Sequence, residues 1–305
     1  MFDYKKFIKS RDVRIKVLRM LNFVPDSIML RVQYFIKTGR LLHLKNPQRY
    51  TEKLQWYKLY YKDPLMAQCV DKYEVRKYVE QCGLGHILNE CYGVFERVED
   101  IDFDKLPNSF VLKDTLGGGG NDVIIVKDKT QADLNAIKKR LNEWVNRPGT
   151  DKSSGREWPY QGHKHRIIIE KNLLQPGVTD LPDYKFFCFG GNPVFCQVIT
   201  DRHNGEKIDW FDMNWQHQPF TGIAFPFPFA EREPKCPFQL EKMKQFCVIL
   251  AQPFPFVRVD FYEVDKQIVF GELTFYPASG YGYFTPDEYD FMLGKQFVLP
   301  NKRSK

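Results

Sequence analysis

The 305-residue sequence lacks a hydrophobic run long enough to cross a membrane. A spanning helix needs roughly 18 uninterrupted apolar residues, whereas charged residues break up every long apolar stretch of this chain. The basic N-terminus is also soon interrupted by further charges, so we do not expect a secretory signal. Hydrophobic residues still make up 43% of the chain and aromatic residues 15%, which is enough for a substantial core. The composition therefore predicts a globular protein without a membrane span.

The sequence also lacks paired cysteines. Its seven cysteines include no C-x-x-C pair and are scattered along the chain, at positions 69, 82, 91, 188, 196, 236 and 247. An odd and scattered set of this kind is typical of reduced thiols in a cytosolic protein. The one close histidine pair, His163 and His165, lies in a polar stretch with no second ligand pair after it. We therefore expect a surface role for these histidines rather than a zinc site, and a cytoplasmic location.

Two common glycine-rich nucleotide motifs are missing as well. There is no G-x-x-x-x-G-K-[ST], and no G-x-G-x-x-G opens a helix. Instead, the segment Phe110–Val126 has two stretches with a period of two, joined by a lysine and four glycines. Backbone N–H groups of such a loop can bind phosphate oxygens, and Lys113 before the loop can neutralise them. A flexible hairpin turn is the alternative explanation of the glycine run.

Two acidic residues are predicted to lie on a later hairpin. Val257–Phe261 and Ile268–Phe275 alternate as strands around a short turn, and they carry Asp260 and Glu272. Carboxylates on adjacent strands can converge on one hard cation, and Mg²⁺ is usually held by one or two carboxylates together with substrate phosphates. The apolar neighbours favour buried acids, which need partners. The alternative is a pair of solvent-facing acids on a surface hairpin.

Charge is unevenly distributed along the chain. Residues 1–40 contain ten basic and three acidic residues, an excess that equals the whole formal net charge of +7. Apolar residues are interleaved with these cations, a pattern that suits an anionic membrane surface. The same pattern fits an amphipathic helix packed on the protein with its charges solvated, or a segment that binds a polyanionic polymer.

Four segments, in order along the chain, resemble the ATP-grasp superfamily and specifically its TupA-like branch. They are Asn46–Trp56, Asp71–Val79, Val111–Lys113 with the glycine run, and Arg258-x-Asp260 followed by Glu272-x-Thr274. The resemblance implies an α+β fold, the ATP-grasp fold, in which two α+β subdomains hold ATP between them. We predict a basic helical N-terminal segment over residues 1–65, a subdomain with the glycine-rich loop over 66–165, and a C-terminal subdomain with the metal site over 166–305.

Local patterns add further elements to this fold. The periodicity of apolar residues predicts helices over residues 127–145 and 238–252. Two strands over 183–189 and 193–200 flank a Gly-Gly-Asn sequence, which indicates a hairpin.

The resemblance also implies which residues contact the phosphates of ATP. Lys72 and Lys113 would be the two phosphate lysines. The mobile loop that closes over the phosphates would consist of Gly117, Gly118, Gly119 and Gly120.

The remainder of the nucleotide would be bound from the strand that follows. Glu170 would accept a hydrogen bond from the adenine amino group, and the backbone of Lys171 and Leu173 would complete the contact. Asp183 would bind the ribose and Lys185 the phosphates.

The metal and catalytic roles fall on the acidic hairpin. By the resemblance, Asp260 and Glu272 would bind Mg²⁺, and Arg258 would be catalytic, together with Lys113, by stabilising the oxyanion of the transition state. The family usually ends this motif with Glu-x-Asn, where the Asn is a metal ligand, but here Thr274 takes that place. Threonine is a weaker oxygen ligand, so the substitution bears on the number of metal ions.

Together these features predict an ATP- and Mg²⁺-dependent ligase that joins a carboxylate to an amine through an acyl phosphate. The TupA-like resemblance implies modification of a bacterial cell-surface polysaccharide or its precursor. A carboxylate-bearing sugar or amino acid and an amine would then be the partners. The protein would be cytoplasmic, with residues 1–40 as a candidate contact to the inner face of the plasma membrane.

Two other functions compete with the ligase. Asp102-Phe103-Asp104 and Asp209-Trp210-Phe211-Asp212 mimic the acidic motif of nucleotide-sugar enzymes, which would make the protein a glycosyltransferase in capsule or O-antigen assembly. A non-enzymatic adaptor that binds polyanions through its N-terminal segment is the other alternative. The neutral remainder of the chain argues against nucleic acid as a partner, because nucleic-acid binders usually carry a basic stripe on the folded domain.

Overall fold

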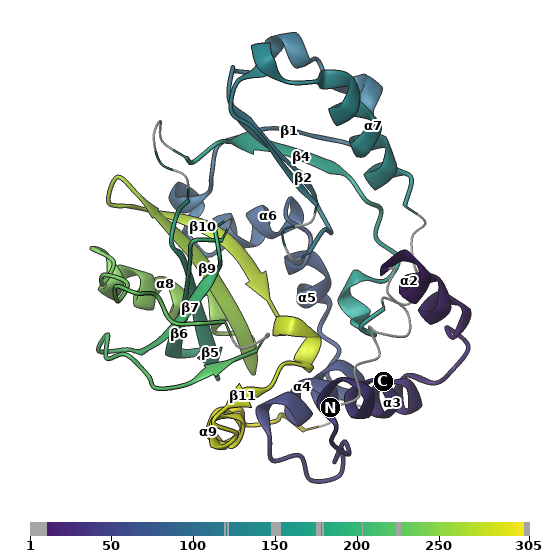
Figure 1. Ribbon diagram of the computed structural model, residues 1–305, viewed down its shortest axis with the longest axis vertical. Coiled ribbons are helices and arrows are strands. Elements are labelled where there is room, and N and C mark those ends of the chain that lie inside the picture. The colour runs from purple at the N-terminus through teal and green to yellow at the C-terminus, as the bar shows by residue number, and fades with distance from the viewer. Residues whose placement is uncertain are drawn as a thin grey trace.

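Two antiparallel sheets form the framework of the protein (Figure 1). The computed structural model describes residues 11–118, 120, 122–147, 154–174, 178, 180–202, 204–223 and 227–301. The smaller sheet has the order β1-β4-β2-β3, with strands Cys91–Phe95, Ile167–Lys171, Phe110–Asp114 and Val123–Val126. The larger sheet has the order β10-β9-β5-β6-β7, with strands Gln267–Thr274, Phe256–Val264, Asp183–Phe189, Asn192–Thr200 and Lys207–Asp212. A two-stranded pair, β8 (Thr221–Gly222) and β11 (Phe284–Thr285), completes the strands.

Helices cover both sheets. Helix α7 (Leu134–Val145) packs on the smaller sheet and α8 (Leu240–Ala251) on the larger one. Figure 1 shows α5 (Pro64–Cys69) and α6 (Glu74–Gln81) between the two sheets. The remaining described helices are α2 (Arg11–Met20), α3 (Asp26–Thr38), α4 (Tyr50–Tyr60) and α9 (Glu288–Gln296).

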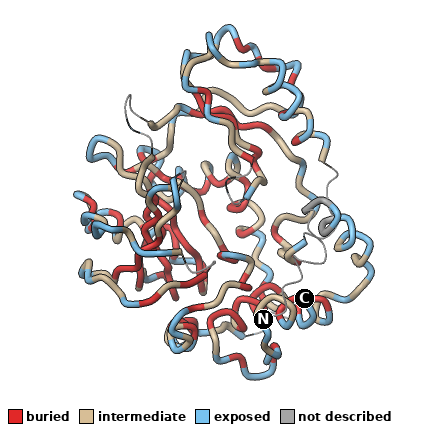
Figure 2. The backbone as a smooth tube through the Cα atoms, viewed as in Figure 1, coloured by how far each residue is buried: buried red, intermediate tan, exposed pale blue. Residues whose placement is uncertain are grey.

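The hydrophobic side chains form separate cores under the two sheets. The larger core joins side chains of α4, α5 and α6 to those of the five-stranded sheet, α8 and α9. The smaller core lies between the four-stranded sheet and α7, around Phe110, Leu112 and Trp144. Figure 2 shows buried residues concentrated in the larger sheet. The α+β architecture predicted from the sequence is confirmed, while the predicted boundaries at residues 65 and 165 stay predictions.

The local predictions hold with shifted ends. The hairpins around the glycine run, at residues 183–200 and at the acidic pair are all present as β2–β3, β5–β6 and β9–β10. The helix predicted over 127–145 begins only at Leu134, because Asp133 accepts a hydrogen bond from the Ala136 N–H at 3.0 Å and sets the helix start there. Residues 129–131 form a 3₁₀ turn instead. No helix among the described residues is long and apolar enough to span a membrane.

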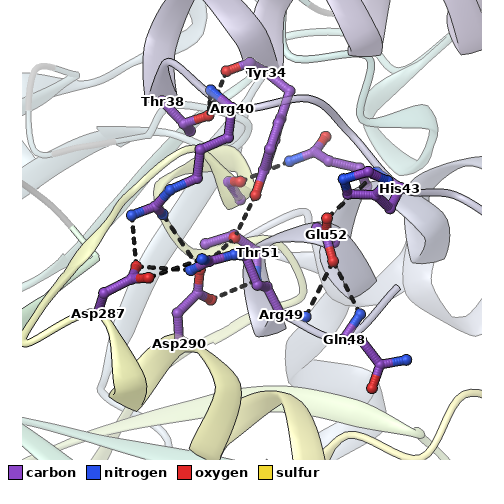
Figure 3. A network of polar contacts seen from close by, with 12 residues as sticks. Tyr34, Thr38, Arg40, His43, Gln48, Arg49, Thr51, Glu52, Asp287 and Asp290 are labelled. Carbon is purple, nitrogen blue, oxygen red and sulfur yellow. Dashed lines mark hydrogen bonds and ion pairs between the residues drawn. The ribbon is translucent and has the colours of Figure 1, made fainter. Parts of the chain in front are cut away.

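A buried polar network attaches the N-terminal helices to α9 (Figure 3). Asp290 is completely buried and accepts hydrogen bonds from the Thr51 N–H at 3.0 Å, the Thr51 hydroxyl at 2.8 Å and Arg49 at 3.4 Å. Arg49 also binds both carboxylate oxygens of the half-exposed Asp287, at 2.7 and 2.8 Å. Glu52 accepts from the N–H groups of Gln48 and Arg49, which satisfies backbone donors at the start of α4.

This network generates a stability prediction. Replacing Asp290→Ala leaves Arg49 and the Thr51 N–H without their buried acceptor, so we expect the free energy of unfolding to fall by about 3 kcal/mol. Asp287→Ala removes a partly exposed partner of the same arginine, and we expect a loss of less than about 1 kcal/mol. Urea unfolding of both variants measures the difference. Equal losses would show that burial of Asp290 does not set its contribution.

Candidate functional site

Three adjacent strands carry polar pairs spaced two residues apart. These pairs are Asp183-x-Lys185 on β5, Arg258-x-Asp260 on β9 and Glu272-x-Thr274 on β10. Residues i and i+2 of a strand point to the same face of the sheet. The register places Lys185 opposite Asp260, and Asp260 opposite Glu272. Six charged or hydroxyl side chains are thereby gathered on one face of an otherwise apolar sheet.

Arg258 holds the carboxylates of this cluster together. Its Nε donates to Asp260 Oδ1 at 2.7 Å, and one terminal nitrogen donates to Asp260 Oδ2 at 2.6 Å. The same nitrogen reaches Glu272 Oε1 at 2.9 Å and Thr274 Oγ1 at 3.0 Å. The Thr274 hydroxyl in turn donates to Glu272 Oε1 at 3.0 Å. One guanidinium group therefore bridges all three predicted metal ligands.

Lys185 extends the cluster onto β5. Its Nζ lies 2.5 Å from Asp260 Oδ2 and 2.7 Å from Asp183 Oδ2. Arg202, which follows β6, binds the same Asp183 oxygen at 2.6 Å. Asp183, Lys185 and Asp260 are almost fully buried, so each charge depends on its neighbours for stabilisation.

A β-bulge aims Glu272 away from its strand neighbours. The pairing of β10 with β9 shifts register between Phe270 and Glu272. A Cβ atom added at Gly271 would lie 3.0 Å from the Asp260 carbonyl oxygen, which is a tight contact at the bulge. The Glu272 side chain stays 44% exposed, whereas that of Asp260 is 2% exposed. Glu272 is thus the most exposed charged side chain of the cluster.

Positive side chains around Glu272 keep it ionised. Burial would raise the pKa of Glu272, but attraction to Arg258, Lys185 and Lys72 outweighs it and lowers the pKa to about 2. Lys72 lies just before α6 and outside the larger sheet, so its attraction to Glu272 shows that a second part of the chain approaches this cluster.

Lys72 also connects this cluster to the smaller sheet. Its Nζ donates to the carbonyl oxygen of Gly117 in the glycine-rich loop. Burial lowers the pKa of Lys72, and repulsion from Lys113 adds to this, while attraction to Glu272 opposes it. Lys72 therefore lies within electrostatic range of both sheets.

Lys113 is paired on the smaller sheet. Its Nζ lies 2.7 Å from Glu170 Oε2, across the β2–β4 pairing. Arg76 of α6 binds the other Glu170 oxygen at 3.3 Å and the Asn89 carbonyl at 2.9 Å. The predicted adenine acceptor Glu170 is thus also the anchor of a predicted phosphate lysine. Arg76 lies within the quoted Asp71–Val79 motif, but its type and position alone did not indicate this role.

The backbone around the predicted adenine contacts is partly occupied. The Lys171 N–H donates to the Glu90 carbonyl at 2.9 Å, and the Lys171 carbonyl accepts from Asn89 Nδ2 at 2.9 Å. Leu173 has no such bond to the described residues. Among the described residues, the backbone N–H and C=O of Leu173 therefore remain available for the predicted contact to adenine, whereas those of Lys171 are already hydrogen-bonded.

A second polar cluster fixes the base of the glycine-rich loop. Asp114 is fully buried and accepts from His165 Nδ1 at 2.8 Å, from Arg147 at 3.0 Å and from the Leu116 N–H at 3.0 Å. Arg147 also binds Asp122 at 2.6 Å. The surface role expected for His165 is therefore wrong, because this histidine is held against a buried carboxylate. A polar sequence context gave no sign of that long-range contact.

The glycines of the loop differ in their surroundings. A Cβ atom at Gly117 would lie 2.5 Å from the Asp122 Cβ and 3.1 Å from the Asp114 Cβ, whereas Gly118 has nothing within 4 Å. Gly120 has a positive φ of 73°, which favours glycine. Gly119 lies outside the described residues.

The segment after Thr274 has a strained backbone, and Lys58 of α4 binds it through hydrogen bonds. Ala278 and Ser279 have φ values of 47° and 56°. The buried Lys58 donates to the Ser279 carbonyl at 2.7 Å, the Ser279 hydroxyl at 3.0 Å and the Gly155 carbonyl at 2.8 Å. Burial lowers the pKa of Lys58 to about 7. Sequence reasoning missed Lys58, because its helix pattern gives no signal of a buried amine.

The donor set is suited to a magnesium ion. Among the described residues, no group of three or more His, Cys, Asp or Glu side chains forms a metal site. Asp260, Glu272 and Thr274 do offer oxygen atoms of the kind Mg²⁺ prefers, all within reach of one Arg258 nitrogen. Two protein carboxylates with substrate phosphates are enough for Mg²⁺, so these residues fit the ion.

Comparison with known protein families identifies the family of the chain. The model of the family described as TupA-like ATPgrasp matches residues 52–298. The match covers most of the chain, so the protein belongs to the TupA-like ATP-grasp family, and its fold is the ATP-grasp fold. None of the curated proteins matches the chain.

The chain also matches solved structures over part of their length. D-alanine–D-alanine ligase from Bacillus anthracis is 18% identical with a TM-score of 0.42, over 68% of this chain and 57% of that one. N5-carboxyaminoimidazole synthetase from Staphylococcus aureus, complexed with ADP, is 13% identical with a TM-score of 0.44, over 77% of this chain and 53% of that one. The chain thus spans little more than half the length of these enzymes.

The glycine-rich loop generates a prediction with a matched control. We expect Gly117→Ala to lower the free energy of unfolding by about 1–3 kcal/mol, because its methyl group would push Asp122 and Asp114 apart. Gly118→Ala, in open space, should change it by less than about 0.5 kcal/mol. Urea unfolding monitored by tryptophan fluorescence measures both. A tolerated Gly117→Ala would contradict the close approach.

The lowered pKa of Glu272 generates a pH prediction. A carboxyl group with a pKa lowered in the folded state stabilises the protein above its unfolded pKa and loses that contribution as the pH falls toward about 2. We therefore expect the stability of Glu272→Gln to fall less steeply than that of the wild type between about pH 5 and pH 3. The number of protons taken up on unfolding should be smaller in the variant by up to about one. Urea midpoints across this range test it. The exposed Glu96→Gln is the control and should follow the wild type.

Proposed function

We propose that this chain is an ATP- and Mg²⁺-dependent carboxylate–amine ligase, acting through an acyl phosphate. The observation that carries the proposal is the convergence of Lys72 on both sheets. Its amine contacts the glycine-rich loop at Gly117, and its charge interacts with Lys113 on one side and Glu272 on the other. Cations and a glycine-rich loop beside a carboxylate pair are the parts that phosphoryl transfer needs.

Each group has a physical task in this proposal. Lys72, Lys113 and Lys185 would offset the charge of the nucleotide phosphates, and the N–H groups of the loop would bind their oxygens. Asp183 would bind the ribose, while Glu170 and Leu173 would contact adenine. Lys113 is held by Glu170 and Lys185 by Asp260, so both cations are oriented before any ligand arrives.

Arg258 is proposed as the catalytic cation. A carboxylate is a poor electrophile, and transfer of the γ-phosphoryl group from ATP, which releases ADP, converts it into an acyl phosphate. An amine can attack this acyl phosphate and expel inorganic phosphate to leave an amide. Negative charge then develops on the carbonyl oxygen, and a guanidinium group fixed in place stabilises it without reorganisation. The hydrogen bonds of Arg258 to Asp260, Glu272 and Thr274 hold that group in place.

Magnesium would be held by Asp260 and Glu272, with the Thr274 hydroxyl nearby. Bound there, Mg²⁺ would neutralise phosphate charge. Thr274 replaces the Asn that is usual in ATP-grasp enzymes, and its hydroxyl is already shared between Arg258 and Glu272. We therefore propose that Thr274 orients the two other side chains more than it binds metal.

The acceptor in this proposal is a bacterial cell-surface polysaccharide or its precursor. A uronic acid or an acidic amino acid would supply the carboxylate, and an amino acid or amino sugar the amine. This substrate class is an expectation that rests on the TupA-like resemblance of the sequence motifs. We also propose a cytoplasmic location, because ATP is available there and seven cysteines without disulfides are typical of reduced thiols.

The glycosyltransferase alternative receives little support from its acidic motifs. Asp209 is buried and accepts from His217 at 2.8 Å and the Ala230 N–H at 3.1 Å. Asp102 caps a surface turn and pairs with Lys105 at 3.0 Å. These carboxylates serve local structure, so neither motif presents a free acidic pair for a nucleotide sugar.

Calorimetric titration tests the ligase proposal. We expect the wild type to bind Mg²⁺-ATP and not Mg²⁺-UDP-sugars. Lys113→Ala removes a charge-assisted contact to phosphate and should weaken ATP binding by about tenfold or more. Lys105→Ala removes a surface lysine of the same subdomain and should leave ATP binding unchanged. ADP release with candidate acids and amines is the next measurement.

The opposite result is equally clear. A folded wild type that ignores ATP but binds a UDP-sugar would overturn the ligase and favour the glycosyltransferase. Equal ATP binding by wild type and Lys113→Ala would remove Lys113 from the site while leaving the enzyme class in place.

A further inference from the structure

The N-terminal helices carry apolar side chains on their solvent-facing sides. On α3, Met29, Leu30 and Tyr34 are buried against the protein. Ile28, Val32 and Phe35, on the opposite side at spacing i, i+4 and i+7, are 52%, 47% and 54% exposed. An amphipathic surface helix normally presents polar residues there. Helix α3 is therefore apolar on both sides, and one side lacks a partner within the described chain.

Helix α2 repeats this pattern. Val13, Val17 and Met20 have the same i, i+4, i+7 spacing and are all exposed, Met20 to 77%. In both helices the i+3 position of the stripe is a cation, Lys16 in α2 and Arg31 in α3, and both residues are exposed. Two successive helices thus share one arrangement of three apolar residues and one basic residue.

The turn between the helices presents the most exposed aromatic residue of the described chain. Phe23 is 82% exposed. The turn itself is fixed, because the buried Arg156 donates to the Leu21 carbonyl at 2.8 Å and pairs with Asp26 at 2.9 Å. Phe23 is therefore held outward by a rigid support.

The charge of the segment indicates which partner covers this surface. Residues 1–40 contain the whole net charge of +7, and Asp26, one of the three acids, is neutralised by Arg156. A second copy of the chain would bring a second positive surface against the first. Exposed apolar side chains interleaved with cations are instead the pattern of a helix that lies in the interface of an anionic bilayer.

We propose that α2, α3 and the turn between them form a docking surface for an anionic lipid bilayer. Phe23, Met20 and Phe35 enter the boundary between head groups and acyl chains, while Lys16 and Arg31 contact lipid phosphates. The helices lie in the membrane plane and do not cross it. The sequence left open whether this segment packs on the protein or meets a membrane, and the structure allows α3 to do both through opposite sides.

Vesicle co-sedimentation of the full chain tests the docking surface. We expect binding to vesicles of phosphatidylcholine and phosphatidylglycerol at roughly three to one, weakened by salt, and little binding to phosphatidylcholine alone. Phe23→Gln with Phe35→Gln should weaken binding about tenfold or more, because two apolar side chains no longer leave water. Lys16→Glu with Arg31→Glu should abolish the preference for anionic vesicles.

Matched variants elsewhere on the surface are the controls. Phe238 and Val298 are 71% and 77% exposed, so Phe238→Gln with Val298→Gln removes similar apolar area and should leave vesicle binding unchanged. Lys139→Glu with Lys235→Glu makes the same charge change at other exposed positions. Near-ultraviolet circular dichroism verifies that every variant is folded.

Four outcomes would overturn the proposal. The first is a folded wild type that ignores anionic vesicles. The second is equal weakening by the variants at Phe23 and Phe35 and by the control pair. The third is sedimentation of the wild type as a dimer that Phe23→Gln with Phe35→Gln dissociates, which would assign the surface to a second copy. Binding that soluble polyphosphate displaces completely, with no loss in the phenylalanine variant, would assign it to a free polyanion.

Discussion

The guanidinium group of Arg258 is the centre on which the polar face of the larger sheet depends. Asp260 and Glu272 lie opposite each other in the strand pairing, and Asp183 is close by on β5. Without a cation between them, carboxylates in such surroundings repel each other and take up protons. Arg258 and Lys185 form ion pairs with these acids within an aromatic core, so a site for a highly charged ligand can be built on a hydrophobic sheet.

The two sheets are linked electrostatically as well as by the chain. Lys72 contacts the glycine-rich loop of the smaller sheet and interacts with Glu272 of the larger one. Asp114, Arg147 and His165 fix the base of that loop, while its outer glycines have open space around them. The loop is therefore rigid where it leaves the strand and unobstructed at Gly118.

Much of this arrangement could be predicted from the sequence, because its spacing is local. The strand pairs Arg258-x-Asp260 and Glu272-x-Thr274 predicted a hairpin, and the lysine with its glycine run predicted another. The ordered motifs predicted the family. Contacts between distant segments gave no local signal, and this explains the errors. His165 lies 51 residues from Asp114, and Arg76 lies 94 residues from Glu170. The bulge between Phe270 and Glu272 could not be predicted either, because the alternating pattern of apolar residues does not show where the strand pairing shifts.

Tyr50 lies just outside the part of the chain that matches the family model, but inside the main hydrophobic core. The family match begins at residue 52, inside α4. Tyr50, two residues earlier, is buried and its ring contacts those of Phe187, Phe189, Phe256, Phe284 and Phe297. Arg49 and Thr51 join α4 to α9 beside it. A chain that began at residue 52 would therefore lose Tyr50, an aromatic ring at the centre of its main core. The match to the family model thus begins inside a helix whose first residues belong to the same core.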